Sequence, residues 1–153
     1  MNTKKSFLLM VLLAVGLVLS GCGGQETVEA PEPVEIAEPA LTITGSVGEE
    51  LTWTMDELQL MDAVDAEYTG KDGETETFNG VSLVDLLVDA NPDEGAETVV
   101  FTAGDDYQAE AALGEVLDCA DCVVAFDGDS LRLVMPDFSG KLQVKDLVRI
   151  GIQ

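Results

Sequence analysis

The sequence predicts an α+β domain that is mostly β, with a few short helices. Runs in which apolar and polar residues alternate, as at residues 41–44 and 64–68, recur between turn residues and indicate half-buried strands. At residues 54–57 and 82–85, a hydroxyl residue stands three positions before an acid. Side chains at this spacing can satisfy backbone N–H groups that the first helical turn leaves unpaired. With 153 residues, the chain is long enough for one domain with a buried core.

Four strands and two helices are predicted in the first half of this domain. The strands are expected at residues 41–44, 51–53, 64–68 and 75–78. The first helix starts after Thr54, passes through Leu58 and Leu60, and is short. The second starts near Ser82, and its apolar face at helical spacing consists of Leu83, Leu86, Leu87 and Ala90. It should end at Asn91, because the following proline disfavours helical geometry at the residue before it.

Strand signals dominate the second half of the domain. Residues 99–101 form a compact β-rich run, and the alternating residues 107–113 are expected to be its hairpin partner with one buried face. Residues 123–126 and 131–135 flank a turn sequence and indicate a second hairpin. Residues 144–152 should supply the closing strand or strand pair.

Residues 1–21 are predicted to be a lipoprotein signal peptide. Their apolar run at residues 7–19 follows two lysines and is too short to span a bilayer comfortably, since about 20 apolar residues are needed. The run ends in Leu-Ser-Gly-Cys at residues 19–22, which resembles a bacterial lipobox. The alternative is an ordinary signal peptide beside a chance cysteine. From the lipobox-like pattern, we predict that Cys22 is the lipidation site, where acyl chains such as palmitate would anchor the chain at the extracytoplasmic face of the bacterial cell membrane.

Residues 22–40 are predicted to be an acidic tether rich in proline and glutamate. Three prolines alternate with glutamates in this stretch. Repeated proline and like charge favour an extended, unpacked chain. The tether would hold the domain of residues 41–153 away from the membrane.

The composition is strongly acidic. Seven Lys and Arg stand against 30 Asp and Glu, with no His and a formal net charge of −23. Lys4 and Lys5 lie in the expected leader, and the other five cations are Lys71, Arg132, Lys141, Lys145 and Arg149. Such a surface repels phosphates, so nucleic acid is excluded as a partner. Solubility, mutual repulsion or adaptation to salt explains the charge; the sharper alternative is attraction of cations or basic partners.

The segments of residues 41–153 resemble, in order and spacing, the molybdopterin-binding domain of the sulfite-oxidase-like oxidoreductases. The pattern Gly-Val-x-Leu-x-Asp-Leu-Leu at residues 80–87 carries much of this resemblance. Asp105-Asp106-Tyr107 stands where the family has Asp-Gly-Tyr, with the glycine replaced. The other matches are Leu-x-Ile-x-Gly at 41–45, Thr-x-x-Glu-Leu at 54–58, Leu-x-Leu-Val-x-Pro at 131–136 and Val-Lys-x-Leu-x-x-Ile at 144–150. The resemblance implies the fold of that family.

The resemblance also implies a molybdopterin cofactor, whose metal is bound by a cysteine thiolate upstream of residues 80–87. Residues 61–78 contain no cysteine. Basic and histidine side chains help such enzymes to hold the pterin phosphate and the oxyanion substrate, yet this chain has no histidine and few cations. We therefore predict no molybdopterin, no metal site and no catalytic residues, because a multiply anionic cofactor would be costly to bury here.

Cys119 and Cys122 form a Cys-x-x-Cys pair in a chain that is expected to reach an oxidising compartment. A structural disulfide, two free semi-buried thiols and thiol-disulfide exchange are the readings that remain open. Asp118 and Asp121 oppose the last, because nearby negative charge disfavours a thiolate. Haem attachment would need a histidine where Val123 stands, and zinc would need more ligands.

Two other features have simpler explanations than ligand binding. The helix start at Ser82 could attract an anion, but a capping role for the serine is the simpler interpretation. The acidic turns at residues 93–94, 105–106 and 127–129 lack the spacing of a calcium loop and are expected to be solvated.

Two functions follow from these observations. The first is a membrane-anchored extracytoplasmic lipoprotein whose domain is a non-catalytic binding or interaction module for a protein partner or small ligand. The second is a redox protein, either a pterin-cofactor-binding oxidoreductase component or a thiol-disulfide protein that uses Cys119 and Cys122.

Overall fold

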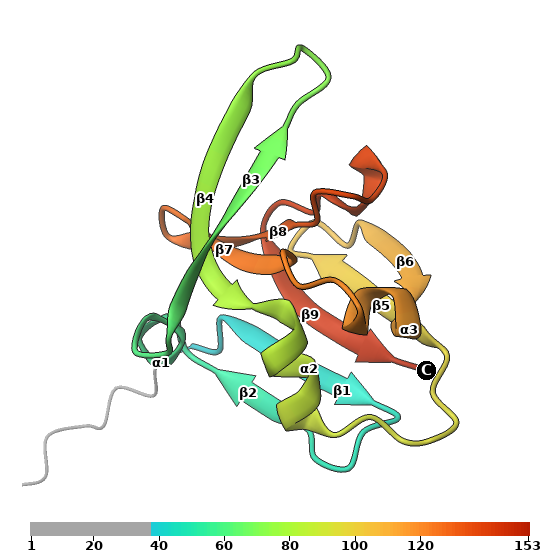
Figure 1. Ribbon diagram of the computed structural model, residues 1–153. Coiled ribbons are helices and arrows are strands. Elements are labelled where there is room, and N and C mark those ends of the chain that lie inside the picture. Colours follow the sequence, from blue (N-terminus) through green and yellow to red (C-terminus); the bar gives the residue numbers. More distant parts are fainter. Residues whose placement is uncertain (1–37) are drawn as a thin grey trace, which may run out of the picture. The chain divides into compact units, whose positions relative to one another are not determined.

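The computed structural model describes residues 38–153 of the chain (Figure 1). The expected leader, Cys22 and nearly all of the expected tether lie outside the described residues. Residues 38–153 contain nine strands, three α-helices and one 3-10 helix, which confirms the prediction of a mostly β, α+β domain. None of the helices in this part of the chain is long and apolar enough to cross a membrane.

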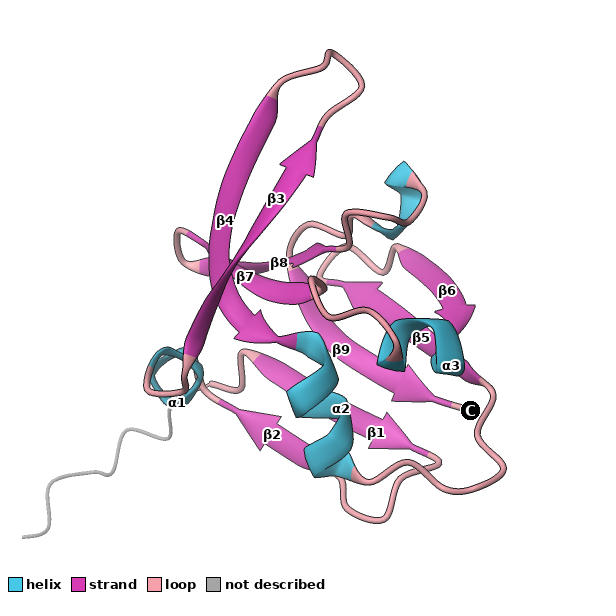
Figure 2. Ribbon diagram, viewed as in Figure 1, coloured by secondary structure: helices cyan, strands magenta, loops and turns pink. Residues whose placement is uncertain are grey.

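The larger sheet has five strands in the order β2-β1-β9-β5-β6 (Figure 2). They are β1 (Leu41–Gly45), β2 (Leu51–Trp53), β5 (Thr98–Ala103), β6 (Gln108–Ala112) and β9 (Leu147–Ile152). The two opening strands pair antiparallel, as predicted. The last strand, β9, lies between β1 and β5, parallel to the first and antiparallel to the second. The two ends of the domain are therefore joined in the middle of this sheet.

The smaller sheet has four strands in the order β3-β4-β7-β8. They are β3 (Ala63–Thr69), β4 (Thr75–Ser82), β7 (Val123–Asp127) and β8 (Ser130–Val134). All of β3 pairs with β4, but β4 pairs with β7 only through Gly80, Val81 and Ser82. The distal end of the β3–β4 hairpin therefore projects beyond the sheet, as Figure 1 shows.

Both predicted helix starts are capped by their hydroxyl residues. At α1 (Met55–Gln59), the Thr54 hydroxyl accepts from the Glu57 N–H at 3.3 Å, and the Glu57 carboxylate accepts from the Thr54 N–H at 2.8 Å. At α2 (Leu83–Ala90), Ser82 Oγ accepts from the Asp85 N–H at 3.2 Å. The second bond of the capping box is absent there, because aspartate is one methylene shorter than glutamate. Asn91 ends α2 with a φ of 52°.

The structure corrects the prediction for residues 107–113. Residues of β6 pair with β5 as predicted, but the face expected to be buried is only half-buried and Tyr107 is 45% exposed. Leu113 starts a third helix, α3 (Leu113–Leu117), which the sequence did not predict. Its N-cap residue, Ala112, makes no side-chain capping bond, and Gly114 lies within the helix, so local signals for it are missing. Burial of Leu113 and Val116 in the core stabilises it instead.

The closing strand is also shorter than expected. It begins at Leu147, because Asp146 has a φ of 53° that interrupts the extended backbone. Of the preceding residues, Lys145 forms an isolated antiparallel bridge with Arg132 of β8. Ser139 is followed by the 3-10 helix η1 (Gly140–Leu142) at the predicted turn.

The main core gathers the predicted apolar face of α2 and side chains from both sheets. Leu83, Leu86, Leu87 and Ala90 are at most 1% exposed. They pack in one cluster that includes Ile43, Phe101 and Ile150 of the larger sheet and Leu131 and Leu133 of the smaller one. A second, small cluster lies on the other face of the smaller sheet and consists of Ala66, Val123, Ala125 and Val134, with Tyr68 and Phe78 partly buried against it.

Candidate functional site

The groove beside the start of α2 does not suit an anion. It has a volume of about 330 Å³ and is lined by the apolar residues Leu60, Met61, Val81 and Leu86 and by three carboxylates, Asp62, Asp85 and Asp89. Ser82 is not among its lining residues, and its hydroxyl already accepts from the Asp85 N–H. Carboxylates without a neighbouring cation repel a negatively charged ligand. The capping interpretation of Ser82 therefore describes this helix start.

The Cys119 and Cys122 sulfur atoms are bonded to each other in the structure. Cys119 is 9% exposed and Cys122 is 0% exposed, and both residues belong to the main core. The Cys122 carbonyl also accepts from the Leu83 N–H at 2.9 Å, so this loop holds the first residue of α2. Thiol exchange needs a sulfur atom that another thiolate can reach, so the burial favours a structural role.

Three cations converge on one cleft of the domain. Lys71, Arg132 and Lys145 line a cavity of about 510 Å³, which we call the cation cleft. One wall comes from the projecting β3–β4 hairpin, including Tyr68, and the other comes from β8 and residues 140–145. Three carboxylates, from Asp72, Glu74 and Glu76, line the hairpin side of the same cleft.

Arg132 is the central residue of the cation cleft. Its guanidinium carbon lies 4.7 Å from the centroid of the Phe78 ring, within the range of a cation–π contact. Its Nε is buried and has no hydrogen-bond partner among the described residues. A buried N–H group without a hydrogen-bond partner costs free energy. Arg132 is thus packed over the ring with its Nε unpaired, in a cleft that is also lined by two lysines and three carboxylates.

The turn of the hairpin places Lys71 across the cleft from η1. Gly70 N–H donates to the Glu74 carbonyl at 2.8 Å, and the Asp72 carboxylate accepts from the Glu74 N–H at 3.3 Å. Gly73, with a φ of 83°, completes this turn. A Cβ built at Gly140 would lie 3.6 Å from Lys71 Cε, which shows how closely the lysine approaches the opposite wall.

The opposite wall is held to β8 by one side chain. Gln143 Oε1 accepts from the Met135 N–H at 3.1 Å, and Gln143 Nε2 donates to the Met135 carbonyl at 2.6 Å. Where β8 ends, these two bonds from a side chain take the place of the backbone hydrogen bonds that a neighbouring strand would make. Together with the Arg132–Lys145 bridge, it keeps the two cations on neighbouring segments.

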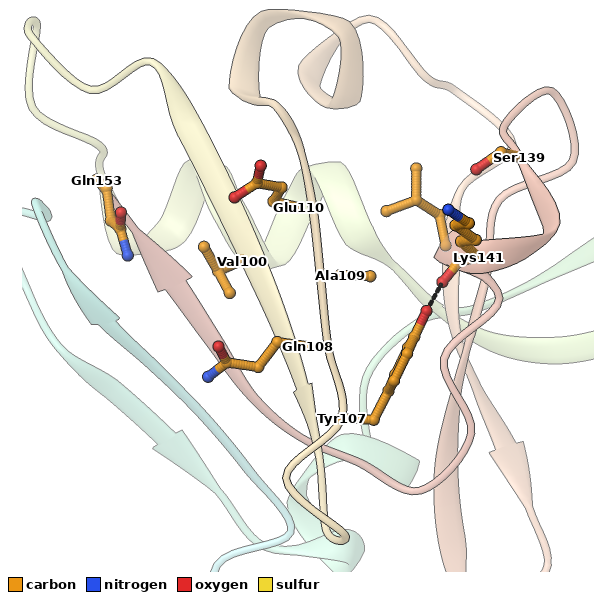
Figure 3. Close-up of a pocket in the computed structure, with 9 residues that line it drawn as sticks. Val100, Tyr107, Gln108, Ala109, Glu110, Ser139, Lys141 and Gln153 are labelled. Carbon is orange, nitrogen blue, oxygen red and sulfur yellow. Dashed lines mark hydrogen bonds between the residues drawn. The ribbon is translucent and has the colours of Figure 1, made fainter.

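A second cavity, of about 500 Å³, lies along β6 on the other side of η1 (Figure 3). Its charged lining residues are Glu110 and Lys141. The Tyr107 hydroxyl donates to the Lys141 carbonyl at 3.0 Å and so joins the β5–β6 turn to η1. Lys141 thus lines this cavity and not the cation cleft, while Arg149 is exposed on β9.

Sequence reasoning named these five cations but did not predict that three of them meet. Lys71 lies 61 positions before Arg132, and Lys145 lies 13 positions after it. The signal in the sequence was their scarcity among 30 carboxylates. Their convergence depends on the pairing of β8 with β7 and of β7 with β4.

The donor set does not fit molybdopterin, the cofactor that the resemblance implies. Residues 61–78, upstream of the pattern at residues 80–87, contain no cysteine, and the two cysteines of the described residues are bonded to each other. Residues 38–153 also contain no cluster of three or more His, Cys, Asp or Glu side chains that could hold a metal ion.

Comparisons with known proteins agree with this fold. The family model of the oxidoreductase molybdopterin binding domain matches residues 28–153. The chain is similar to the crystal structure of the sulfane dehydrogenase SoxCD from Paracoccus pantotrophus, with a TM-score of 0.63 and 20% sequence identity over 73% of this chain and 37% of that chain. No curated protein sequence matches. The structural likeness shows a sulfite-oxidase-like fold, and with the family match it confirms the resemblance: the chain belongs to the oxidoreductase molybdopterin-binding domain family.

Proposed function

We propose that this chain is a membrane-anchored extracytoplasmic lipoprotein whose domain is a non-catalytic binding module. The observation that carries the non-catalytic part is the missing metal ligand in a domain that otherwise keeps the family's fold. Without a thiolate upstream of residues 80–87, the domain has no group to hold molybdenum in the family's manner. It therefore does no oxo-transfer chemistry.

The anchoring part of the proposal is supported by the sequence. Residues 19–22 carry the lipobox-like pattern, and the acidic residues 22–40 separate Cys22 from the first strand, which begins at Leu41. Acyl chains on Cys22 would attach the chain stably to the membrane at roughly 0.8 kcal/mol per buried methylene. The acidic domain itself would be repelled by anionic lipid headgroups.

Metal analysis of the purified full chain tests the non-catalytic part. The chain is expressed in a bacterium grown with added molybdate, together with a family member that has the ligand cysteine as a positive control. We expect stoichiometric molybdenum and pterin fluorescence in the control, and neither in this chain. Stoichiometric molybdenum in this chain contradicts the proposal.

Lipid labelling tests the anchoring part. Cells that express the chain or its Cys22→Ser variant are fed with labelled palmitate and then fractionated. We expect label and membrane attachment for the chain, and no label for the variant. Processing that continues in the presence of globomycin, an inhibitor of the lipoprotein signal peptidase, contradicts the lipobox assignment.

Thiol-disulfide exchange through Cys119 and Cys122 is the second candidate function. The bonded pair of sulfurs favours it chemically, but their burial opposes it. An insulin-reduction assay decides between the two: we expect no activity above background for the chain or for its Cys119→Ser variant. Activity that the Cys119→Ser substitution abolishes would support the redox function.

A further inference from the structure

The cation cleft concentrates charges that are scarce in the rest of the chain. Five cations lie outside the expected leader, and Lys71, Arg132 and Lys145 line this one cleft. We propose that the cleft binds a small organic molecule with a single carboxylate group, and that Arg132 is its main anchor. This inference rests on the proposed function, because it names the ligand class of the non-catalytic module.

Arg132 has the features of an anion anchor. Its guanidinium lies over the Phe78 ring at 4.7 Å, which fixes the side chain before any ligand arrives. Its Nε is enclosed and unpaired, while the remainder of this half-buried side chain lines the cleft. A planar guanidinium pairs with a planar carboxylate through two parallel hydrogen bonds, which a lysine cannot do. A carboxylate would thus supply hydrogen-bond acceptors to this guanidinium, whose Nε has no partner among the described residues.

The charge balance of the cleft favours one negative charge on the ligand. Asp72, Glu74 and Glu76 oppose the three cations, and the whole chain has a formal net charge of −23. The three cations and three carboxylates balance within the cleft, so the net negative charge of the whole chain sets the long-range repulsion, which is twice as large for a dianion such as sulfate as for a monoanion. A neutral ligand would form no charge-assisted pair with the Arg132 guanidinium. A monocarboxylate satisfies both conditions.

The size and lining of the cleft favour an organic ligand over a free ion. The volume of about 510 Å³ lies within the range of small-molecule sites and exceeds what a carboxylate group fills. Tyr68 lines the cleft, and with Phe78 it packs on the small apolar cluster beneath. An apolar or aromatic body attached to the carboxylate can therefore lie against Tyr68.

The chain has two arginines, which gives the experiment an internal control. Sodium benzoate is titrated into the full chain in neutral detergent micelles, at constant ionic strength, and the two arginine Nε–Hε signals are followed by NMR. We expect the Arg132 signal to shift and saturate, while the signal of the exposed Arg149 stays in place. In a parallel titration with sodium sulfate, the Arg132 shift should saturate only at higher ligand concentration.

Matched variants assign the binding to the cleft. With binding followed in every variant by the backbone amide signals of the cleft residues, Arg132→Gln should weaken benzoate binding roughly tenfold or more, as expected for the loss of a bidentate charged pair, whereas Arg149→Gln should change it by less than about twofold. Arg132→Lys, which keeps the charge but not the fork, should also weaken binding. Thermal melts of each variant show whether it is folded, and the wild-type titration needs no variant at all.

Three results overturn the proposal: no shift of Arg132, equal shifts of both arginines, or tighter binding of sulfate than of benzoate. The metal analysis keeps this test separate from the proposed function. Metal-free protein that fails to bind benzoate contradicts the ligand class alone, whereas protein that contains molybdenum contradicts the non-catalytic module itself.

Discussion

The two faces of the four-stranded sheet perform different tasks. One face contributes Val81, Val124, Leu131 and Leu133 to the main core, and these side chains are at most 3% exposed. The other face contributes a small cluster of alanines and valines and then continues into the cation cleft. The large side chains of the first face fill the space between the sheets. The small ones of the second face leave room for Arg132 and for a ligand.

The difference follows from strand alternation. Leu131 and Leu133 point to one face of β8, and Arg132 between them points to the other. In the same strand, Leu131 and Leu133 therefore stabilise the core, whereas Arg132 lines the cleft. Substitutions on the two faces should separate these roles, and the following predictions run from the largest expected effect to the smallest.

Gly80 is the residue at which the pairing of β4 with β7 begins, opposite Ala125. A Cβ added there would collide with the Val124 carbonyl oxygen and with Ala125 Cα, both backbone atoms. We expect Gly80→Ala to lower the free energy of unfolding by about 3 kcal/mol or more, because backbone cannot move aside cheaply. Gly95→Ala, where nothing lies within 4 Å, is the control and should be nearly neutral. Denaturant unfolding followed by circular dichroism measures both variants. Equal effects would mean that the β7 backbone does not lie close to Gly80.

Neighbouring residues of β8 should show opposite effects on stability and binding. Leu133 is fully buried, so Leu133→Ala should lower the free energy of unfolding by about 3 kcal/mol. Benzoate affinity of the folded protein should stay unchanged. Arg132→Met should abolish benzoate binding but change the free energy of unfolding by only about 1 kcal/mol or less, because a half-buried guanidinium whose Nε has no hydrogen-bond partner is exchanged for an apolar side chain. A large loss of stability in Arg132→Met would give Arg132 a structural role and weaken the contrast between the faces.

The disulfide closes the loop that leads into β7. By the chain-entropy relation, a loop of about four residues contributes roughly 2 kcal/mol to the free energy of unfolding. The double variant Cys119→Ser/Cys122→Ser should lose about that amount in denaturant unfolding. The reductant-treated wild type should unfold like this variant. If reductant leaves the unfolding curve of the wild type unchanged, the disulfide is absent or contributes nothing.

The turn between β5 and β6 belongs to the other sheet and offers a stabilising change. Asp106 has a φ of 67°, in the left-handed region, at the position where the family has glycine. Asp106→Gly should raise the free energy of unfolding by up to about 1 kcal/mol, since glycine adopts this conformation without a steric cost. The control is Asp105→Gly, which should be destabilising because the Asp105 carboxylate accepts from the Tyr107 N–H at 3.0 Å. A thermal melt distinguishes the two directions, and both variants should keep benzoate binding.

The cap of α1, a helix that packs on the main core through Leu58, should make a small, pH-dependent contribution to the free energy of unfolding. Hydrogen bonds from the Thr54 N–H and hydroxyl lower the pKa of Glu57 below its ordinary value of 4.5. The pKa is thus lower in the folded state than in the unfolded one, so the contribution is present above the unfolded pKa and is lost as the pH falls through the folded pKa. Stability should therefore fall less in Glu57→Gln than in the wild type between pH 6 and about pH 3. Identical pH profiles would show that the cap does not titrate.

Local patterns in the sequence were sufficient for most elements. The alternation at residues 41–44 and 64–68, and the hydroxyl–acid pairs at both helix starts, predicted strands and caps that the structure confirms. Such signals act between residues a few positions apart, so they can be read directly. The helix α3 was missed because Ala112 and Gly114 provide neither a cap nor helix propensity.

The sequence by itself determined the α+β class, the order of its segments and the family that this order resembles. It also determined the missing thiol, because no fold can supply an absent side chain. Only the tertiary structure decided that β9 pairs parallel with β1 and that Lys71, Arg132 and Lys145 share one cleft. The physical reason is that periodicity reports which face of its own strand a side chain occupies, whereas its neighbours in space depend on which strands pair and in which register.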